Sequence, residues 1–178
     1  MRIVVCVKHV PDMQSERRFE GGRLVRGEDD VLNELDENAI EAAVQLKESE
    51  EDAGREAEVV ALTMGPEDAE DSLMRALQMG ADRAYIVSDE FLEGSDVITT
   101  ASVLAVAIAK ISEECGPVDL VITGMASLDA MTSMLPGALA AKAHMPLLGL
   151  ARSLSVADGA VTIERAVDGY TETVRAAL

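Results

Sequence analysis

Apolar residues follow two different spacings along the chain, and these spacings predict two kinds of element. Four short runs are almost entirely apolar and rich in β-branched residues, which is typical of buried β-strands. They cover residues 2–8, 57–65, 81–88 and 118–123. The segments between them repeat their apolar positions every three or four residues, as amphipathic helices do. Strands that alternate with helices in this way predict a mostly parallel sheet covered by helices.

Helix start and stop signals flank the segments between these strands. The four helices are expected to begin at Asn33, at Pro66, at Ser95 or Asp96, and near Ser133. Asn, Ser and Asp are good N-cap residues, and Pro fits the first helical turn. The second helix should stop at Gly80, the third at residues 115–117, and the fourth near residue 143. Asp36 lies in the first turn of the first helix, where its charge suits the helix dipole.

Two further regions are predicted to form antiparallel structure. Within residues 19–28, Gly21 and Gly22 separate two short extended pieces, which is typical of a hairpin. After Pro146 apolar and polar residues alternate in three successive runs, which predicts a β-meander. The three runs are residues 147–156, 160–167 and 170–178. The expected fold class is therefore α/β: one domain over residues 1–178, with three layers, a mostly parallel sheet and a C-terminal β-meander.

Composition sets the nature of the core and of the surface. Aromatic residues make up only 2% of the chain and Trp is absent, so the core must consist of Val, Ile, Leu, Met and Ala. The net charge of −18 argues against nucleic-acid binding, which needs cations to neutralise phosphates. The charge is uneven: residues 27–58 hold 13 acidic residues, whereas residues 1–26 hold six Lys or Arg and three acids. A solvated helix face is the simplest interpretation of the acidic block, and a docking surface for a basic partner is the alternative.

Cysteine usage and the N-terminus indicate the compartment. Cys6 and Cys115 form no disulfide framework and show no metal-ligand spacing. The chain opens directly into a strand pattern without the regions of a signal peptide. No apolar stretch approaches the roughly 18 residues of a membrane span. We therefore expect a soluble, cytoplasmic protein without membrane insertion.

The residues that follow the fourth predicted strand form the most promising ligand site. Ligands of open parallel sheets bind beyond the carboxyl ends of the strands. If the first and fourth strands are neighbours, residues 6–9 lie beside residues 124–132, and residues 63–65 can reach the same crevice. Asp129 is the only charged residue between positions 124 and 141. A phosphate is excluded by carboxylates but suits a helix N-terminus with free N–H groups.

Individual residues of this segment fit such a ligand. Gly124 and Ala126 allow the backbone to approach closely, and the hydroxyls of Thr132 and Ser133 could add donors. Asp129 could accept a hydrogen bond from a ribose or an amine. The alternative is that the small residues serve only close packing of strand and helix.

The chain offers little for catalysis. His9 and His144 are the only histidines, and no nucleophile, Walker or dinucleotide motif occurs. Cys6 lies in a strand among apolar residues, which is typical of a structural thiol. Four methionines around the site are expected to pack in the core: Met125, Met131, Met134 and Met145. The sequence therefore predicts a binding protein, and not an enzyme.

Five stretches of the chain resemble the beta subunit of electron-transferring flavoprotein, in that family's order and spacing. They are residues 1–12, 33–48, 59–87, 118–130 and 161–178. The segment from Gly65 to Arg83 is the most specific of them. The resemblance implies a Rossmann-like, adenine-nucleotide-binding fold. It also implies a heterodimer with an alpha subunit, together carrying FAD, which passes electrons from donor dehydrogenases to a downstream acceptor. In such subunits one AMP is bound as a structural ligand that takes no part in chemistry.

The resemblance also implies which residues contact the AMP. They come from the first strand, the start of the first helix, the end of the second strand and the loop after the fourth strand. The residues are Cys6, Asn33, Glu34, Leu35, Asp36, Met64, Gly124, Ala126, Ser127, Asp129, Thr132, Ser133, Met134 and Leu135. The phosphate would lie on the backbone of residues 132–134. Asp129 is the clearest side-chain match.

This chain departs from the family pattern at several positions. Glu34 stands where proline is usual, and Ala130 and Met131 replace two further acids. Residues 134–136, Met-Leu-Pro, replace the usual Gln-Thr-Gly or Gln-Val-Gly. We therefore expect the backbone to supply most of the phosphate contacts. The family also continues beyond the position of Leu178, so we expect either a truncated form or a short relative that depends strongly on its partner.

Two other classes share the predicted architecture. A free-standing nucleotide-binding regulatory domain of the universal-stress type would need a glycine-rich phosphate loop after the fourth strand, where only Gly124 and Gly137 are available. It remains the alternative function. An adenylating enzyme of the related pyrophosphatase group would need a Ser-Gly-Gly loop after the first strand, which residues 6–10 do not supply.

Overall fold

The computed structural model describes residues 1–178 and contains the predicted parallel sheet. Its strands are β1 (Arg2–Cys6), β6 (Glu58–Met64), β7 (Arg83–Val87) and β8 (Leu120–Thr123). They lie in the order β7-β6-β1-β8, all parallel. Val5 pairs with Ala61 on one side and with Ile122 on the other. The first and fourth predicted strands are therefore neighbours, as the location of the candidate site requires.

Four α-helices and two short 3₁₀ turns connect these strands. They are α1 (Glu34–Asp52), η1 (Glu67–Ala69), α2 (Glu70–Gln78), η2 (Glu90–Leu92), α3 (Val97–Cys115) and α4 (Leu135–Ala143). Asp96 is the N-cap of α3, because its carboxylate accepts a hydrogen bond from the Thr99 N–H at 2.7 Å. The fourth helix begins two residues later than predicted, because Ser133 has a φ of 52°, a conformation that a right-handed helix does not contain. None of the helices combines the length and the apolar character that crossing a membrane requires.

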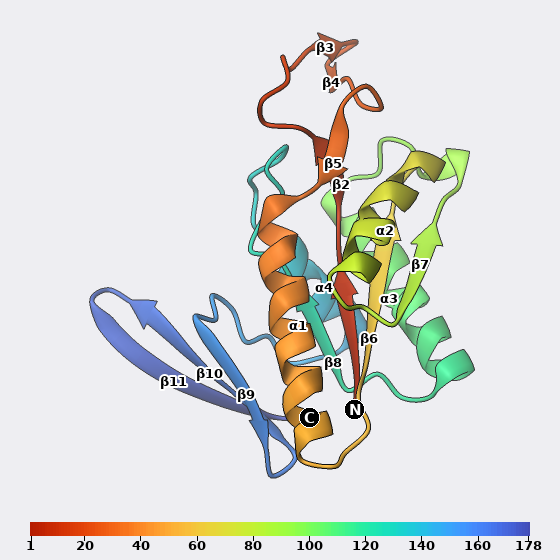
Figure 1. Ribbon diagram of the computed structural model, residues 1–178. Helices are drawn as coiled ribbons and strands as arrows, with labels where there is room; N and C mark the ends of the chain where they lie inside the picture. The colour runs from red at the N-terminus through yellow and green to blue at the C-terminus, as the bar shows by residue number, and fades with distance from the viewer.

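The helices cover both faces of the sheet and give three layers (Figure 1). Alternate residues of each strand belong to different clusters, as the pleat of a strand dictates. Ile3 and Val5 of β1 pack with α1 and α2 on one face, whereas Val4 and Cys6 pack with α3 and α4 on the other. The core is aliphatic, as the composition predicted. The three-layer α/β prediction is confirmed.

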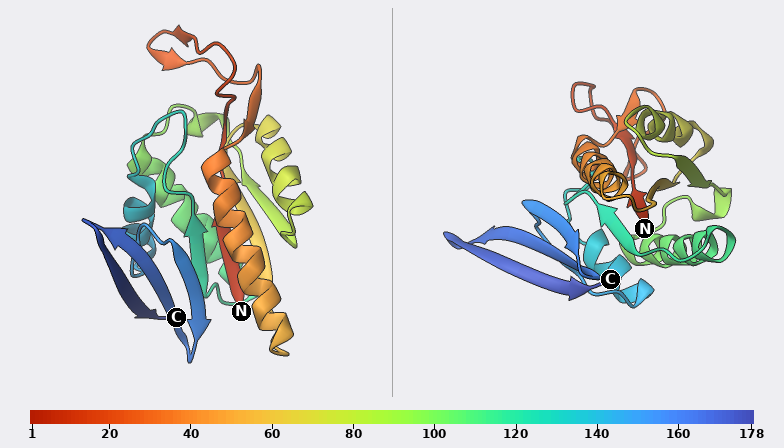
Figure 2. Two further views of the ribbon diagram at one scale, coloured as in Figure 1. Left: turned by 60° about the vertical axis from the view of Figure 1, so that its left-hand side comes forward. Right: turned by 60° about the horizontal axis from the view of Figure 1, so that its bottom comes forward.

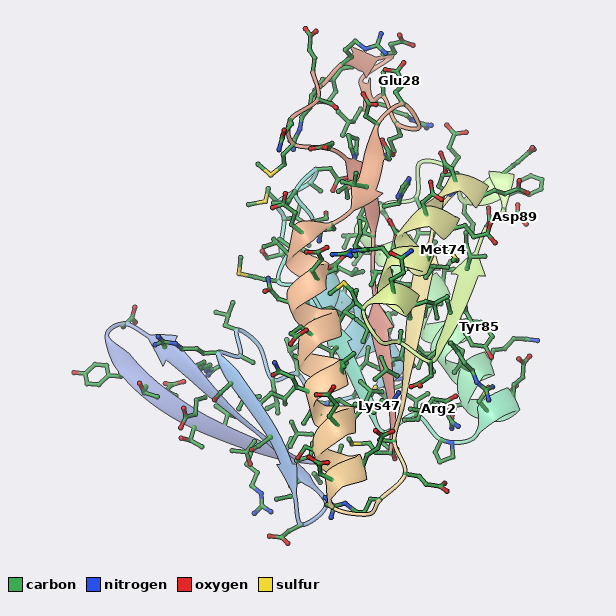
Figure 3. All side chains as sticks on the ribbon, viewed as in Figure 1. Arg2, Glu28, Lys47, Met74, Tyr85 and Asp89 are labelled. Atoms are coloured by element: carbon green, nitrogen blue, oxygen red, sulfur yellow. The ribbon has the colours of Figure 1, made fainter.

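A projecting segment follows the first strand of the sheet. β2 (His9–Pro11) pairs with β5 (Asp30–Leu32), and residues 12–29, here called the finger, extend from this pair at the carboxyl end of the sheet (Figure 1). The finger contains the predicted hairpin, β3 (Phe19–Glu20) and β4 (Arg23–Leu24), with Gly21 and Gly22 at positive φ in its turn. Figure 3 shows Glu28 in this region, at the opposite end of the molecule from Arg2 and Lys47.

The C-terminal meander forms a separate three-stranded antiparallel sheet. It consists of β9 (Ser153–Ala157), β10 (Ala160–Val167) and β11 (Tyr170–Ala177), in the order β11-β10-β9. It lies beside α1 and is not hydrogen-bonded to the parallel sheet (Figure 2). Leu154 and Val156 of β9 pack against the cluster that α1 shares with the sheet. The first run was predicted too long, because residues 147–152 precede β9 without forming a strand.

Candidate functional site

The candidate site lies where β1, β6 and β8 end, around the β8–α4 loop (residues 124–134). Cys6 of β1 is buried in the cluster that α3 and α4 cover. Met64 at the end of β6 and Leu135 at the start of α4 pack against the same cluster. The structure thus brings together three of the expected contact residues from three distant parts of the sequence.

Asn33 ties the β8–α4 loop to the start of α1. Its side chain is fully buried. Its Nδ2 donates to the Ala126 carbonyl at 2.9 Å, and its Oδ1 accepts from the Leu128 N–H at 3.1 Å. Asn33 occupies the N-cap position of α1, but its side chain makes no capping hydrogen bond. The capping role predicted from the sequence is therefore wrong: the side chain holds the loop instead, because both of its polar ends are used there.

Asp36 and Gly124 form a second, tighter contact between α1 and the loop. The buried Asp36 carboxylate accepts a hydrogen bond from the Lys8 N–H at 2.8 Å. A Cβ on Gly124 would lie 2.2 Å from Asp36 Oδ1 and 3.0 Å from the Leu35 carbonyl, so only glycine fits here. Burial raises the pKa of Asp36 to about 6, against the hydrogen bonds that favour its charged form.

Asp129 is surrounded by cations. Its side chain is only 1% exposed, and Lys8 Nζ lies 3.0 Å from Oδ1 and 2.8 Å from Oδ2. Arg26 of the finger also donates to Oδ2. Burial alone would raise the pKa of Asp129, but hydrogen bonds from Arg26, Lys8 and Ser127 hold it well below its usual range. Both carboxylate oxygens predicted to accept from a ligand therefore already have partners within the protein.

The basic residues at the loop were missed in the sequence analysis. Besides Lys8 and Arg26, Arg17 of the finger donates from Nη2 to the Leu128 carbonyl at 3.2 Å. All three come from residues 1–26, where basic residues outnumber acids. That excess was the available signal, but the pattern alone did not show that the finger folds toward the loop.

The end of the loop presents free backbone donors. The N–H groups of Thr132, Ser133, Met134 and Leu135 donate no hydrogen bond within the protein. Met131 and Ser133 have φ values of 50° and 52°, a backbone conformation that is costly for non-glycine residues. Ser133 is left-handed and the next residue, Met134, is right-handed, and a pair of this kind turns successive N–H groups toward a common point, which suits an anion. Pro136 lies in the first turn of α4 and contributes no N–H.

Other residues singled out in the sequence have structural roles or lie elsewhere. Burial raises the pKa of Cys6 to about 12, so its thiol is unreactive. His9 is buried, and its Nδ1 lies 2.7 Å from Ser72 Oγ of α2. Core packing was predicted wrongly for Met125, Met131 and Met134, which are 52%, 60% and 54% exposed. They lie on a loop that stands above the strand ends, where no helix covers them.

Comparison with known proteins indicates the family. The electron transfer flavoprotein domain matches residues 22–178. The chain is 38% identical to the beta subunit of electron transfer flavoprotein from Mycobacterium leprae, over 99% of this chain and 66% of that protein. It is 36% identical to the beta subunit from Megasphaera elsdenii, over 97% and 64% of the two chains. It is also 36% identical to protein FixA of Azorhizobium caulinodans, over 100% and 63%. The chain thus spans slightly less than two thirds of the length of these relatives.

Proposed function

Since the chain belongs to the electron transfer flavoprotein domain family, we propose that it acts as a beta subunit and binds AMP as a structural ligand. Its partner would be an alpha subunit that holds most of the contacts to FAD. FAD, when bound, would supply the electron transfer between donor dehydrogenases and a downstream acceptor. The chain itself would act as a carrier subunit without catalytic residues.

The observation that carries this proposal is the set of four free N–H groups at residues 132–135. Successive unpaired donors at the start of a helix favour a phosphate, and the positive end of the α4 dipole adds to the attraction. The only carboxylate within the loop, that of Asp129, is buried and paired with cations, so it does not repel an anion. The backbone therefore fits the phosphate of AMP without the polar side chains that the family usually has here.

The remaining expected residues would serve AMP in two ways. Cys6, Met64 and Leu135 lie around one apolar cluster and could border the uncharged part of the nucleotide. Asn33 would act indirectly, because its side chain already holds the loop by hydrogen bonds to Ala126 and Leu128. Asp36 would also act indirectly, because its carboxylate is bonded to the Lys8 N–H and packs against Gly124. Recognition of AMP would thus depend on the shape of the β8–α4 loop, which residues at the start of α1 hold in place.

The test is to co-express the chain with its alpha partner and to identify the released small molecules by mass spectrometry. We expect AMP from the beta subunit, and flavin only when the alpha partner is present. A complex that is colourless, or that releases no adenine nucleotide, would contradict the proposal. Tight ATP binding by the chain alone, without any flavin partner, would instead favour the universal-stress type of regulatory domain.

A pair of glycine variants makes the test specific for the loop. Gly124→Ala should lower the amount of AMP that co-purifies, because the added Cβ meets Asp36 and displaces the loop. Gly149→Ala is the matched control, since a Cβ there meets nothing within 4 Å and its backbone conformation is not left-handed. Equal AMP content in both variants would show that the β8–α4 loop, in the position set by its contact with Asp36, does not hold the nucleotide.

A further inference from the structure

We propose that Arg17 and Arg26 of the finger bind the phosphate of the nucleotide by their side chains, with Asp129 as the residue that positions Arg26. This inference rests on the proposed AMP function and deepens it. It adds to the backbone donors of the loop a second set of contacts to the ligand's charge, from a segment outside the loop and outside the parallel sheet. The finger would then be part of the binding site.

The first step is that Asp129 and Lys8 have no capacity left for a ligand. The Lys8 ammonium has three N–H groups and lies within 3.4 Å of three acceptors, namely the two Asp129 oxygens and Ser127 Oγ. The Asp129 side chain is 1% exposed, so a ribose hydroxyl cannot reach it without breaking these contacts. The Lys8–Asp129 ion pair is therefore satisfied within the protein, and it holds the position of Arg26 without contacting the ligand.

The second step is that the two arginines have spare donors. Each guanidinium carries five N–H groups, and Arg17 and Arg26 each use one nitrogen, Nη2, to contact the loop. The Arg26 side chain remains 38% exposed, and Arg17 is exposed as well. The planar fork of an arginine matches two oxygens of a phosphate at once, which gives it an advantage over lysine at such a site.

The third step is that the other arginines of the finger are directed elsewhere. Arg18 pairs with Glu28 within the finger, and Arg23 pairs with Glu93 in the segment before α3. Only Arg17 and Arg26 reach the β8–α4 loop, at Leu128 and Asp129. The free N–H groups follow in the same loop, beginning at residue 132. The β8–α4 loop therefore carries both the contacts of the two arginines and the free backbone donors.

The expected effect follows from the charge of the ligand. A hydrogen bond to a charged group contributes about 1.5–3 kcal/mol, so loss of one arginine should weaken AMP binding about tenfold or more. Adenosine lacks the phosphate and should bind equally well to all the variants. The difference between AMP and adenosine thus isolates the contribution of the phosphate from any general loosening of the site.

The experiment is isothermal titration of AMP and of adenosine into the purified chain, freed of bound nucleotide. We compare the wild type with Arg17→Gln, Arg26→Gln and the matched control Arg23→Gln, all of which change exposed side chains of the finger. The first two variants should lose about tenfold in AMP affinity and keep their adenosine affinity. Arg23→Gln should match the wild type for both ligands.

The outcomes separate this inference from the proposed function. The inference is wrong if the wild type binds AMP but neither Arg17→Gln nor Arg26→Gln changes the ratio of AMP to adenosine affinity. That result would show that these arginines do not bind the phosphate. An equal loss with Arg23→Gln would also overturn it, because it would indicate a general effect of charge. If the wild type binds no AMP at all, the proposed function fails, and the inference that rests on it fails too.

Discussion

Asp36 should make the stability of this protein depend on pH in an unusual direction. The residue is 5% exposed, and burial raises the pKa of its carboxyl group to about 6, compared with an ordinary value of 3.8. Because the pKa is higher in the folded state than in the unfolded state, the protonated form favours folding. The resulting stabilisation is complete below about pH 4 and is lost as the pH rises through about 6.

The size of this effect follows from the shift itself. A difference of one pKa unit corresponds to 1.36 kcal/mol, so a shift of about two units changes the free energy of unfolding by about 3 kcal/mol. Small domains are typically stable by about 5–15 kcal/mol, which makes such a change easy to measure.

Asp129 should change the pH dependence of stability in the opposite direction. Its pKa is lowered in the folded state, so its contribution is present above about pH 4 and is lost as the pH falls further.

Urea unfolding of the wild type and of Asp36→Asn, between about pH 4.5 and about pH 7.5, measures this dependence. The wild type should lose about 2 kcal/mol of this stabilisation over this range, because at pH 4.5 the unfolded state is already mostly deprotonated at Asp36. The asparagine variant cannot titrate and should not show this loss. Asp52→Asn, an exposed position on the same helix, is the control and should follow the wild type. Equal pH dependence in the wild type and in Asp36→Asn would refute the assignment.

Three further predictions concern Gly124 and Asn33, which hold the β8–α4 loop against α1, and the two cysteine thiols. Gly124→Ala should lower the free energy of unfolding by about 1–3 kcal/mol, because its Cβ would overlap Asp36; a change near zero in urea unfolding would contradict the geometry. Asn33→Ala leaves a loop carbonyl and a loop N–H unpaired and should cost about 2–4 kcal/mol in the same assay; Asn33→Asp should cost at least as much, because it places a buried carboxylate oxygen against the Ala126 carbonyl oxygen. A thiol reagent should modify Cys115 alone in the native protein and Cys6 only after denaturation; rapid reaction of both would show that Cys6 is not buried.

The arrangement of the sheet was predictable because each strand carries its own signal. Buried parallel strands are continuous apolar runs, and helices between them must cross back over the sheet. The expected location of the candidate site followed from an assumed strand order, since ligands of such sheets bind where the carboxyl ends of the strands meet. The strands and helices depend on local patterns, whereas the location of the candidate site also depended on one assumed long-range contact, that β1 and β8 are neighbours, which the structure contains.

The contacts that shape the site were not predictable in the same way. Asn33 looked like a helix cap because its local sequence fits one, but its partners lie more than 90 residues away. Asp129 looked like a ligand residue because it is the only charged residue in the segment after the fourth strand and the clearest side-chain match to the family. Its partners, Lys8 and Arg26, are more than 100 residues distant. A polar residue in a loop shows what it can bind, whereas the fold decides whether the partner is a ligand or another part of the chain.

The role of Asp129 leads to a prediction whose sign distinguishes two explanations. If only local charge mattered, Asp129→Asn would remove a negative charge near the phosphate and strengthen AMP binding. If Asp129 positions Arg26, the same variant frees the guanidinium from the loop, and AMP should bind more weakly while adenosine binding is unchanged. Lys8 and Arg26 are 40% and 38% exposed in their side chains, so both can return to water without leaving a buried, unpaired charge. Titration of AMP into Asp129→Asn decides between them: tighter binding would show that the carboxylate opposes the ligand, and weaker binding that it organises the cations.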